Sequence, residues 1–147
     1  MDKIAQSANQ ARSSRGSTFE VNIENLLKEM LKSKKITSFT RSPIIFNKEF
    51  NPDFIVEKLD GNIVCIDSTT TARTDRLRGK QWDANGTKLY FNEVKNKEIT
   101  AVVVVQDTET SDSERANFRR CKVRTTLPHS ALDEVVSVDG LVNLLEQ

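Results

Sequence analysis

Apolar residues recur at helical spacing near the start of the chain. After Ser17 or Thr18, either of which suits an N-cap, they lie about 100° apart around a helix and so form one stripe. The members of this stripe are Phe19, Ile23, Leu26, Leu27, Met30 and Leu31. Residues 1–16 are polar apart from Ile4, and we expect a flexible polar arm there, followed by a single domain over residues 17–147.

Short apolar runs separated by turn residues predict the strands. Residues 54–56 and 63–66 flank Asp60-Gly61, a pair typical of hairpin turns because glycine tolerates a positive φ. Residues 99–106 form a continuous run rich in valine, which indicates a strand buried on both faces. Three shorter strands are expected at residues 36–40, 44–46 and 134–138.

The segments between the strands predict helices. A charged helix follows Thr74 and extends to about residue 96, and Asn85-Gly86 is a point where it can divide. Two shorter helices are expected at residues 112–120 and 141–145, the second with Asp139 as its cap. This order of elements predicts an α/β fold with a mixed central β-sheet flanked by helices.

Size and charge narrow the class of protein. At 147 residues the chain is long enough for one domain with a real core. The net charge is only +1, so any contact with nucleic acid has to come from local patches of lysine and arginine. No apolar run approaches the ~20 residues that span a membrane, and no apolar signal segment begins the chain. We therefore expect a soluble, cytoplasmic protein with no membrane partner.

Two aspartates stand at the outer ends of the predicted hairpin. Asp53 precedes its first strand and Asp67 follows the apolar run of its second. Because hairpin strands are antiparallel, these two residues come to the same end of the strand pair. Two neighbouring carboxylates repel each other unless a cation or a proton separates them. Mg²⁺ takes one or two carboxylates together with waters and substrate phosphates, so we expect a Mg²⁺ site here, with Mn²⁺ as a substitute.

The same residues carry a resemblance to a known family. Pro52-Asp53, thirteen intervening residues and then Asp67-Ser68-Thr69 resemble the signature of the PD-(D/E)XK nucleases, with Thr69 in the place of the usual lysine. The pattern DxTxTxRxDR over residues 67–76 is similar to one that some small restriction-type endonucleases carry after this hairpin. The resemblance covers residues 17–106 and implies a restriction-endonuclease-like core.

The resemblance implies a metal-dependent endonuclease of restriction or homing type that hydrolyses phosphodiester bonds in double-stranded DNA. Asp53 and Asp67 would hold the metal. Glu20 would reach the metal or its water, as acids on the preceding helix often do in this family, although a first-turn acid is also explained by the helix dipole. Cutting both strands implies a homo-oligomer, a partner subunit or repeated nicking.

Thr69 is the main departure from the family pattern. It projects to the same face as Asp67 because side chains alternate along a strand, but its hydroxyl carries no charge. The missing lysine leaves three possibilities. The metal supplies more of the charge stabilisation, another residue supplies the cation, or the protein is an inactive relative that binds nucleic acid or a partner. Arg73, Arg76 and Lys80 are the nearest cations, and we favour the last two for phosphate contact over a merely solvated helix face.

Further basic residues lie in the last third of the chain. Arg115 and Arg119 belong to a cluster that is a candidate DNA-facing patch, with a solvated face as the alternative. His129, the single histidine, follows a proline and is expected to be a loop residue. A third hypothesis makes the protein an unrelated α/β domain, in which Asp53 is a turn residue and Asp67 a strand-end acid.

Overall fold

The computed structural model describes residues 3–70, 74–106 and 131–147. Its described strands form one five-stranded sheet in the order β1-β2-β3-β4-β5. The first three strands are antiparallel neighbours, whereas β4 runs parallel to β3 and β5 parallel to β4. The strands are β1 (Ile36–Arg41), β2 (Phe54–Lys58), β3 (Ile63–Thr69), β4 (Ile99–Val105) and β5 (Glu134–Val136). This mixed sheet confirms the predicted α/β class.

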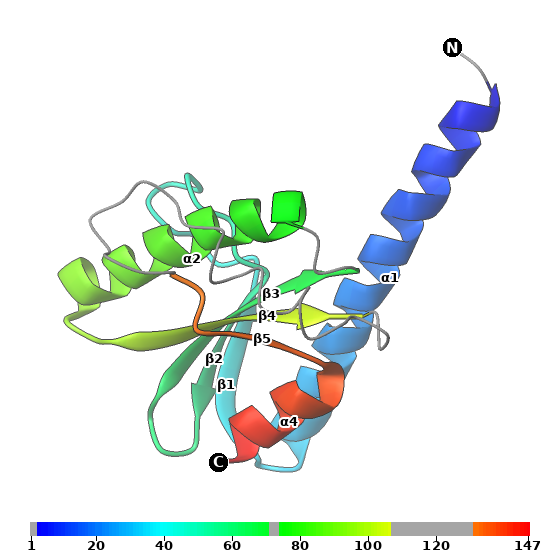
Figure 1. Ribbon diagram of the computed structural model, residues 1–147. Coiled ribbons are helices and arrows are strands. Elements are labelled where there is room, and N and C mark those ends of the chain that lie inside the picture. The colour runs from blue at the N-terminus through cyan, green and yellow to red at the C-terminus, as the bar shows by residue number, and fades with distance from the viewer. Residues whose placement is uncertain (1–2, 71–73, 107–130) are drawn as a thin grey trace.

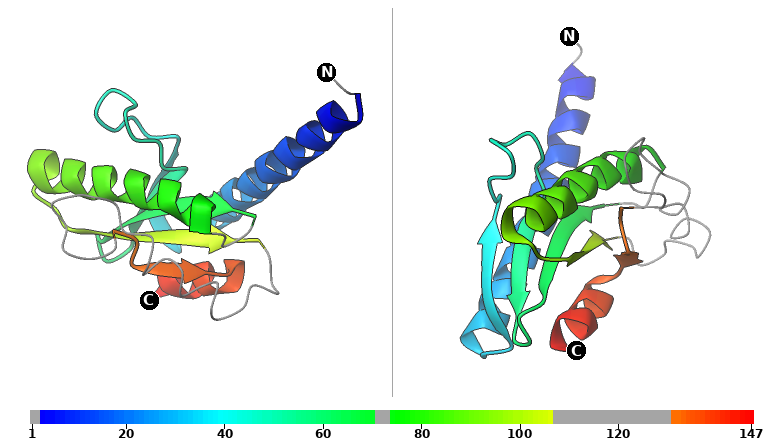
Figure 2. Two further views of the ribbon diagram at one scale, coloured as in Figure 1. Left: turned by 45° about the horizontal axis from the view of Figure 1, so that its top comes forward. Right: turned by 90° about the vertical axis from the view of Figure 1, so that its left-hand side faces the viewer.

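Helices cover both faces of the sheet (Figures 1 and 2). The helices α1 (Lys3–Lys32) and α4 (Val138–Glu146) pack on one face, and α2 (Thr74–Lys95) packs on the other. Helix α2 lies between β3 and β4 in the chain, because two parallel neighbours need a crossover connection. None of the helices in the described ranges is long and apolar enough to cross a membrane.

The alternation of side chains along the strands divides the core into two layers. On one face, Phe54 and Val56 of β2 and Val64 and Ile66 of β3 pack with the apolar stripe of α1. On the opposite face the core comprises Cys65, Leu77, Ala84, Ala101, Val103, Val105, Ala131 and Leu132. Residues 101–105 of β4 contribute to both layers and are buried throughout, as their valine-rich sequence predicts. The odd-numbered positions of β3 therefore face α2.

The first helix is longer than the sequence predicts. It begins at Lys3, so residues 3–16, for which we expect a flexible polar arm, are helical, and this part of α1 extends beyond the sheet (Figure 1). The physical reason is that alanine, glutamine and arginine favour a helix even without an apolar face, and Gly16 alone costs it only about 1 kcal/mol. The last helix also starts earlier than expected, at Val138, where the Ser137 hydroxyl accepts the Gly140 N–H at 3.1 Å.

The segment before β2 is a turn instead of the predicted strand at residues 44–46. Only one bridge forms, between Ile45 and Phe50. Between them the backbone is left-handed at three successive residues, with φ of 46°, 57° and 69° at Phe46, Asn47 and Lys48. A left-handed backbone cannot continue a β-ladder, which explains the wrong prediction. The helix expected at residues 112–120 lies outside the described residues.

Candidate active site

The pairing of β2 with β3 places Asp53 beside Asp67. Phe54 is paired with Ile66. Asp53, which precedes Phe54, and Asp67, which follows Ile66, therefore meet at the same end of the hairpin. The Asp53 N–H donates to Asp67 Oδ1 at 3.2 Å. In return, the Ser68 N–H and hydroxyl donate to Asp53 Oδ2 at 2.8 and 2.7 Å. The two carboxylates are thus held together by the backbone of both strands.

Asp67 is a buried acid with an incomplete set of partners. Its relative exposure is 1 %. Its Oδ2 atom has no hydrogen-bond partner among the residues that the structure describes. Burial raises the pKa of Asp67 well above its ordinary value of 3.8, and the charges of Asp53 and Asp83 act in the same direction. The side chain therefore needs either a proton or a nearby cation.

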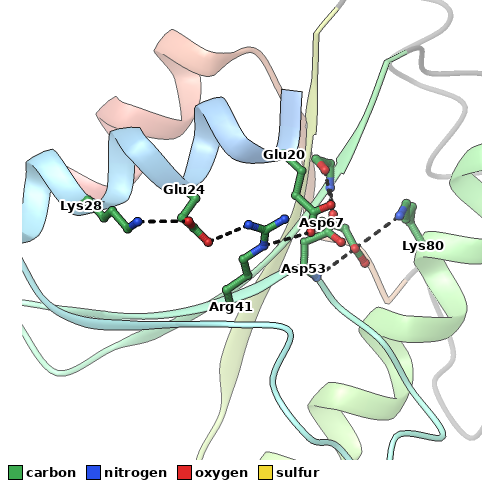
Figure 3. Close-up of polar contacts among 8 residues, drawn as sticks. Glu20, Glu24, Lys28, Arg41, Asp53, Asp67 and Lys80 are labelled. Carbon is green, nitrogen blue, oxygen red and sulfur yellow. Dashed lines mark hydrogen bonds and ion pairs between the residues drawn. The ribbon is translucent and has the colours of Figure 1, made fainter. Parts of the chain in front are cut away.

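Lys80 supplies one positive charge to this acid. It projects from α2, and its Nζ lies 3.4 Å from Asp67 Oδ1 (Figure 3). Burial opposes the charge on the amine, but the carboxylates of Asp67 and Asp53 outweigh that effect and raise the pKa of Lys80 above 10.5. The side chain is consequently an ammonium at neutral pH. Of the cations proposed from the sequence, Arg76 lies one turn earlier on α2 and is exposed.

Glu20 reaches the same end of the hairpin from α1. Burial, followed by the negative charge of Asp53, raises its pKa above 4.5. Arg41 of β1 lies on the other side, with its Nε 3.6 Å from Glu20 Oε1 and its Nη1 2.9 Å from Glu24 Oε2. Glu24 also pairs with Lys28 at 3.2 Å, so it belongs to a surface ion-pair row beside the site (Figure 3).

Asp83 is a further acid at the site that the sequence analysis did not identify. It lies three residues after Lys80 on α2, and its Oδ1 accepts the Asn51 N–H at 2.9 Å. Burial raises its pKa, and its charge acts on both Asp67 and Lys80. In the sequence it looks like an ordinary polar position on a charged helix. Its helical spacing from Lys80 was the available signal, because residues three apart share a face.

Thr69 is the third residue of the predicted Asp67-Ser68-Thr69 motif. It is the last residue of β3, is paired with Val105 and is 6 % exposed. Its carbonyl accepts the Gln106 N–H at 3.0 Å, which continues the β3–β4 ladder by one bond. The side chain lies on the α2 face with Asp67, as predicted. The enclosed position suits a small hydroxyl residue.

Several proposed residues cannot be compared with the structure. Arg73, Arg115, Arg119 and His129 lie outside the described residues. Within residues 3–70, 74–106 and 131–147, no three acids, histidines or cysteines are grouped so that they alone could hold a metal ion. This leaves the predicted Mg²⁺ site open, since Mg²⁺ takes one or two carboxylates and completes its shell with waters and substrate phosphates.

Comparisons with known proteins give no assignment for this chain. No protein-family model matches it, and no curated protein matches it. Its function is therefore inferred from the mixed α/β fold and from the acids and the lysine at the end of the β2–β3 hairpin.

Proposed function

We propose that this protein is a Mg²⁺-dependent DNA endonuclease with a restriction-endonuclease-like core. The observation that carries the proposal is the environment of Asp67. Its Oδ2 is buried and has no partner within the described part of the chain, while its Oδ1 contacts Lys80 beside Asp53. A buried carboxylate with a free oxygen is costly unless a cation or proton compensates it. Oxygen donors of this kind suit Mg²⁺, with Mn²⁺ as a substitute.

The carboxylates at this end of the hairpin suit such an ion. Asp53 and Asp67 would hold it, and Glu20, whose pKa the charge of Asp53 raises, would act directly or through a water. When bound, Mg²⁺ lowers the pKa of a coordinated water and offsets the negative charge of the scissile phosphate.

In this proposal, Lys80 has the role of the lysine that PD-(D/E)XK nucleases carry in the motif. Its ammonium is fixed against Asp67 on the face that Thr69 shares, so it brings positive charge and donors to a phosphate placed over the two aspartates. The Thr69 hydroxyl can orient a water without adding charge. The raised pKa of Glu20 moves this carboxyl toward the range in which a side chain both accepts and releases protons.

Double-stranded DNA is the substrate in this proposal, cut in the manner of a restriction or homing enzyme. One chain has one such site, so cutting both strands requires a homo-oligomer, a partner subunit or two successive nicks. Arg76 is exposed one turn before Lys80, and we propose that it contacts a phosphate next to the site. Arg73, Arg115 and Arg119 are proposed as further phosphate contacts, and the site is proposed to act inside the cell.

Cleavage of supercoiled plasmid tests the proposal. We expect nicked or linear products with Mg²⁺ or Mn²⁺ and none with a chelator, and mapping the ends of the products gives the target sequence. Calorimetric titration of the DNA-free protein with Mn²⁺ should show uptake that Asp53→Asn abolishes. DNA binding without cleavage under either metal would favour a nuclease-fold subunit that binds without cutting. Absence of metal uptake and of DNA binding would favour an unrelated α/β protein.

A further inference from the structure

A second set of contacts joins the segment before Asp53 to helix α2. Asn51 donates its N–H to Asp83, and the Phe50 ring lies against Trp82 with centroids 5.3 Å apart. Earlier in the same turn, Phe46 meets Tyr90 edge to face at 5.3 Å. We call the contacts of Phe50 and Asn51 with α2 the clamp.

Gly86 has no side chain and so leaves room for the Phe50 ring against α2. A Cβ at Gly86 would lie 2.1 to 2.4 Å from three atoms of the Phe50 ring, a distance that real side chains do not tolerate. Phe50 is 7 % exposed as a result of this close approach. Glycine weakens a helix interior, yet α2 continues through Asn85-Gly86, so the residue serves the contact with Phe50. Gly79 on the same helix differs, since nothing lies within 4 Å of its Cβ position.

The clamp connects the two halves of the proposed site by a short path. Asn51 is two residues before Asp53, and Asp83 is three residues after Lys80. Asp53 belongs to the β2 end of the hairpin and Lys80 to α2, which the chain joins only through β3 and residues 70–73. A misplacement of about 1 Å between reacting groups costs roughly a hundredfold in rate, so this link has a large effect on the site.

We propose that Asp83 is a positioning residue that sets Asp53 relative to Lys80 by accepting the Asn51 N–H, with Gly86 and Phe50 as the second half of the same clamp. The inference rests on the proposed function for the roles of Asp53 and Lys80. The carboxylate oxygen acts here as a backbone anchor, so an amide oxygen in the same place preserves the effect.

Asp83→Ala and Asp83→Asn in the full-length protein separate anchoring from charge. In the metal-free protein, NMR hydrogen exchange should show the Asn51 amide at least about tenfold less protected in Asp83→Ala, while Asp83→Asn keeps most of the protection. Mn²⁺ affinity by calorimetry should fall about 10- to 100-fold in Asp83→Ala, the usual range for loss of a supporting contact. The kcat of cleavage should fall with it, while KM changes less, and Asp83→Asn should restore both.

Asp60→Ala is the matched control. Asp60 accepts the Asn62 N–H at 2.9 Å, the same kind of bond at the opposite end of the hairpin. Its loss should leave Mn²⁺ affinity and kcat unchanged. The proposal is overturned if Asp83→Ala behaves like Asp60→Ala, or if Asp83→Asn is as damaged as Asp83→Ala, because the charge and not the anchor would then be responsible.

Gly86→Ala breaks the clamp without removing a polar group, and it remains informative if Asp83→Ala fails to fold. Alanine strengthens the helix but displaces Phe50, so the emission of Trp82, the single tryptophan, should shift and Mn²⁺ affinity should fall. Gly79→Ala should change neither, and equal behaviour of the two variants would refute the clamp. A wild-type protein that does not cleave DNA would overturn the proposed function alone, since amide exchange and Trp82 emission still test the clamp.

Discussion

The β2–β3 hairpin has Asp60 at its turn and Asp53 and Asp67 at its open end, and Asp60 and Asp67 are in opposite states. At the turn, Asp60 is exposed and accepts the Asn62 N–H at 2.9 Å, the Asn62 side chain at 3.0 Å and the Lys58 ammonium at 3.5 Å. The Asn62 N–H, the largest effect, lowers the pKa of Asp60. At the other end, Asp67 is buried, its pKa is raised, and its Oδ2 has no partner among the described residues.

The difference shows how the surroundings decide whether an aspartate is satisfied by nearby donors or needs a cation from another element. Asp60 is satisfied by donors within two residues, so the turn supplies everything that its charge needs. Asp67 depends on Lys80, which comes from a different element thirteen residues away. A buried carboxylate oxygen without a partner costs stability, and among the described residues it occurs at the end where Asp53, Glu20 and Asp83 also gather. We infer that this end of the hairpin is kept for binding a cation.

The largest expected effect is that of Asp67→Asn on cleavage. The substitution removes the charge that would hold the cation, and the rate should fall by at least about 10³-fold, the upper range for loss of one key electrostatic contact. Folding should persist, because asparagine resembles the protonated form that burial favours. Asp60→Asn is the control and should leave the rate within about twofold, as surface changes usually do. Plasmid cleavage and circular dichroism measure both, and equal rates in the two variants would end the comparison.

Lys80→Met should give the next largest effect. Methionine keeps the apolar stem but leaves Asp67 Oδ1 without its cation and a phosphate without its donor. We expect cleavage to fall about 10²-fold, the lower range for removal of one such contact.

Arg76→Met is the matched control for Lys80, since Arg76 lies one turn earlier on the same helix and is exposed. It should mainly weaken DNA binding and reduce the slope of log affinity against log salt by about 1, the value for one phosphate contact. Filter binding at several salt concentrations measures this. If Arg76→Met lost cleavage and Lys80→Met did not, the assignment of the displaced cation would be reversed.

The meeting of Asp53 with Asp67 was predictable because it depends on local geometry. A tight turn at Gly61 fixes the register of two short strands, and the register brings the two acids together. The sequence favours Lys80 and Arg76 among three nearby cations, but it does not single out Lys80. Selecting it requires the way α2 packs on the sheet, which the burial of Leu77 and Ala84 decides through tertiary contacts.

The bond from Asn51 to Asp83 and the clamp as a whole could not be predicted for a related reason. They depend on a left-handed turn at residues 46–48 and on the fit of Phe50 against Gly86, and neither follows from an apolar repeat. Sequence patterns report which face of an element is apolar. They do not report how a polar atom on one element meets the backbone of another.

Asp67 and Asp60 should contribute in opposite directions to the pH dependence of the stability of the metal-free protein. The pKa of Asp67 is raised in the folded state, so its contribution is fully present below its ordinary value of 3.8 and is lost as the pH rises through the raised pKa. The pKa of Asp60 is lowered, so its contribution is present above 3.8 and is lost as the pH falls through the lowered pKa.

Urea unfolding of the protein in a chelator, at a series of pH values, measures this difference. In the wild type, the charge of Asp67 should lower the free energy of unfolding as the pH rises above 3.8, and Asp67→Asn should remove this decline. Asp60 should raise the free energy of unfolding as the pH rises toward 3.8, and Asp60→Asn should remove this gain. Added Mn²⁺ should reverse the decline in the wild type, since a ligand that binds the folded state stabilises it. A wild-type curve indistinguishable from that of Asp67→Asn would show that Asp67 is compensated within the chain.

Thr69→Ala should have the smallest effect, and it tests how far the reactive end of the hairpin extends. Thr69 lies two residues beyond Asp67 on the same face, is buried and carries no charge. Loss of its hydroxyl should cost about 1 kcal/mol of stability, the usual net value of one hydrogen bond. If Lys80 provides the positive charge, cleavage should change by only about threefold, well below the effect of a general acid or base. Complete loss of cleavage in a folded Thr69→Ala protein would instead show that the Thr69 hydroxyl takes part in the chemistry.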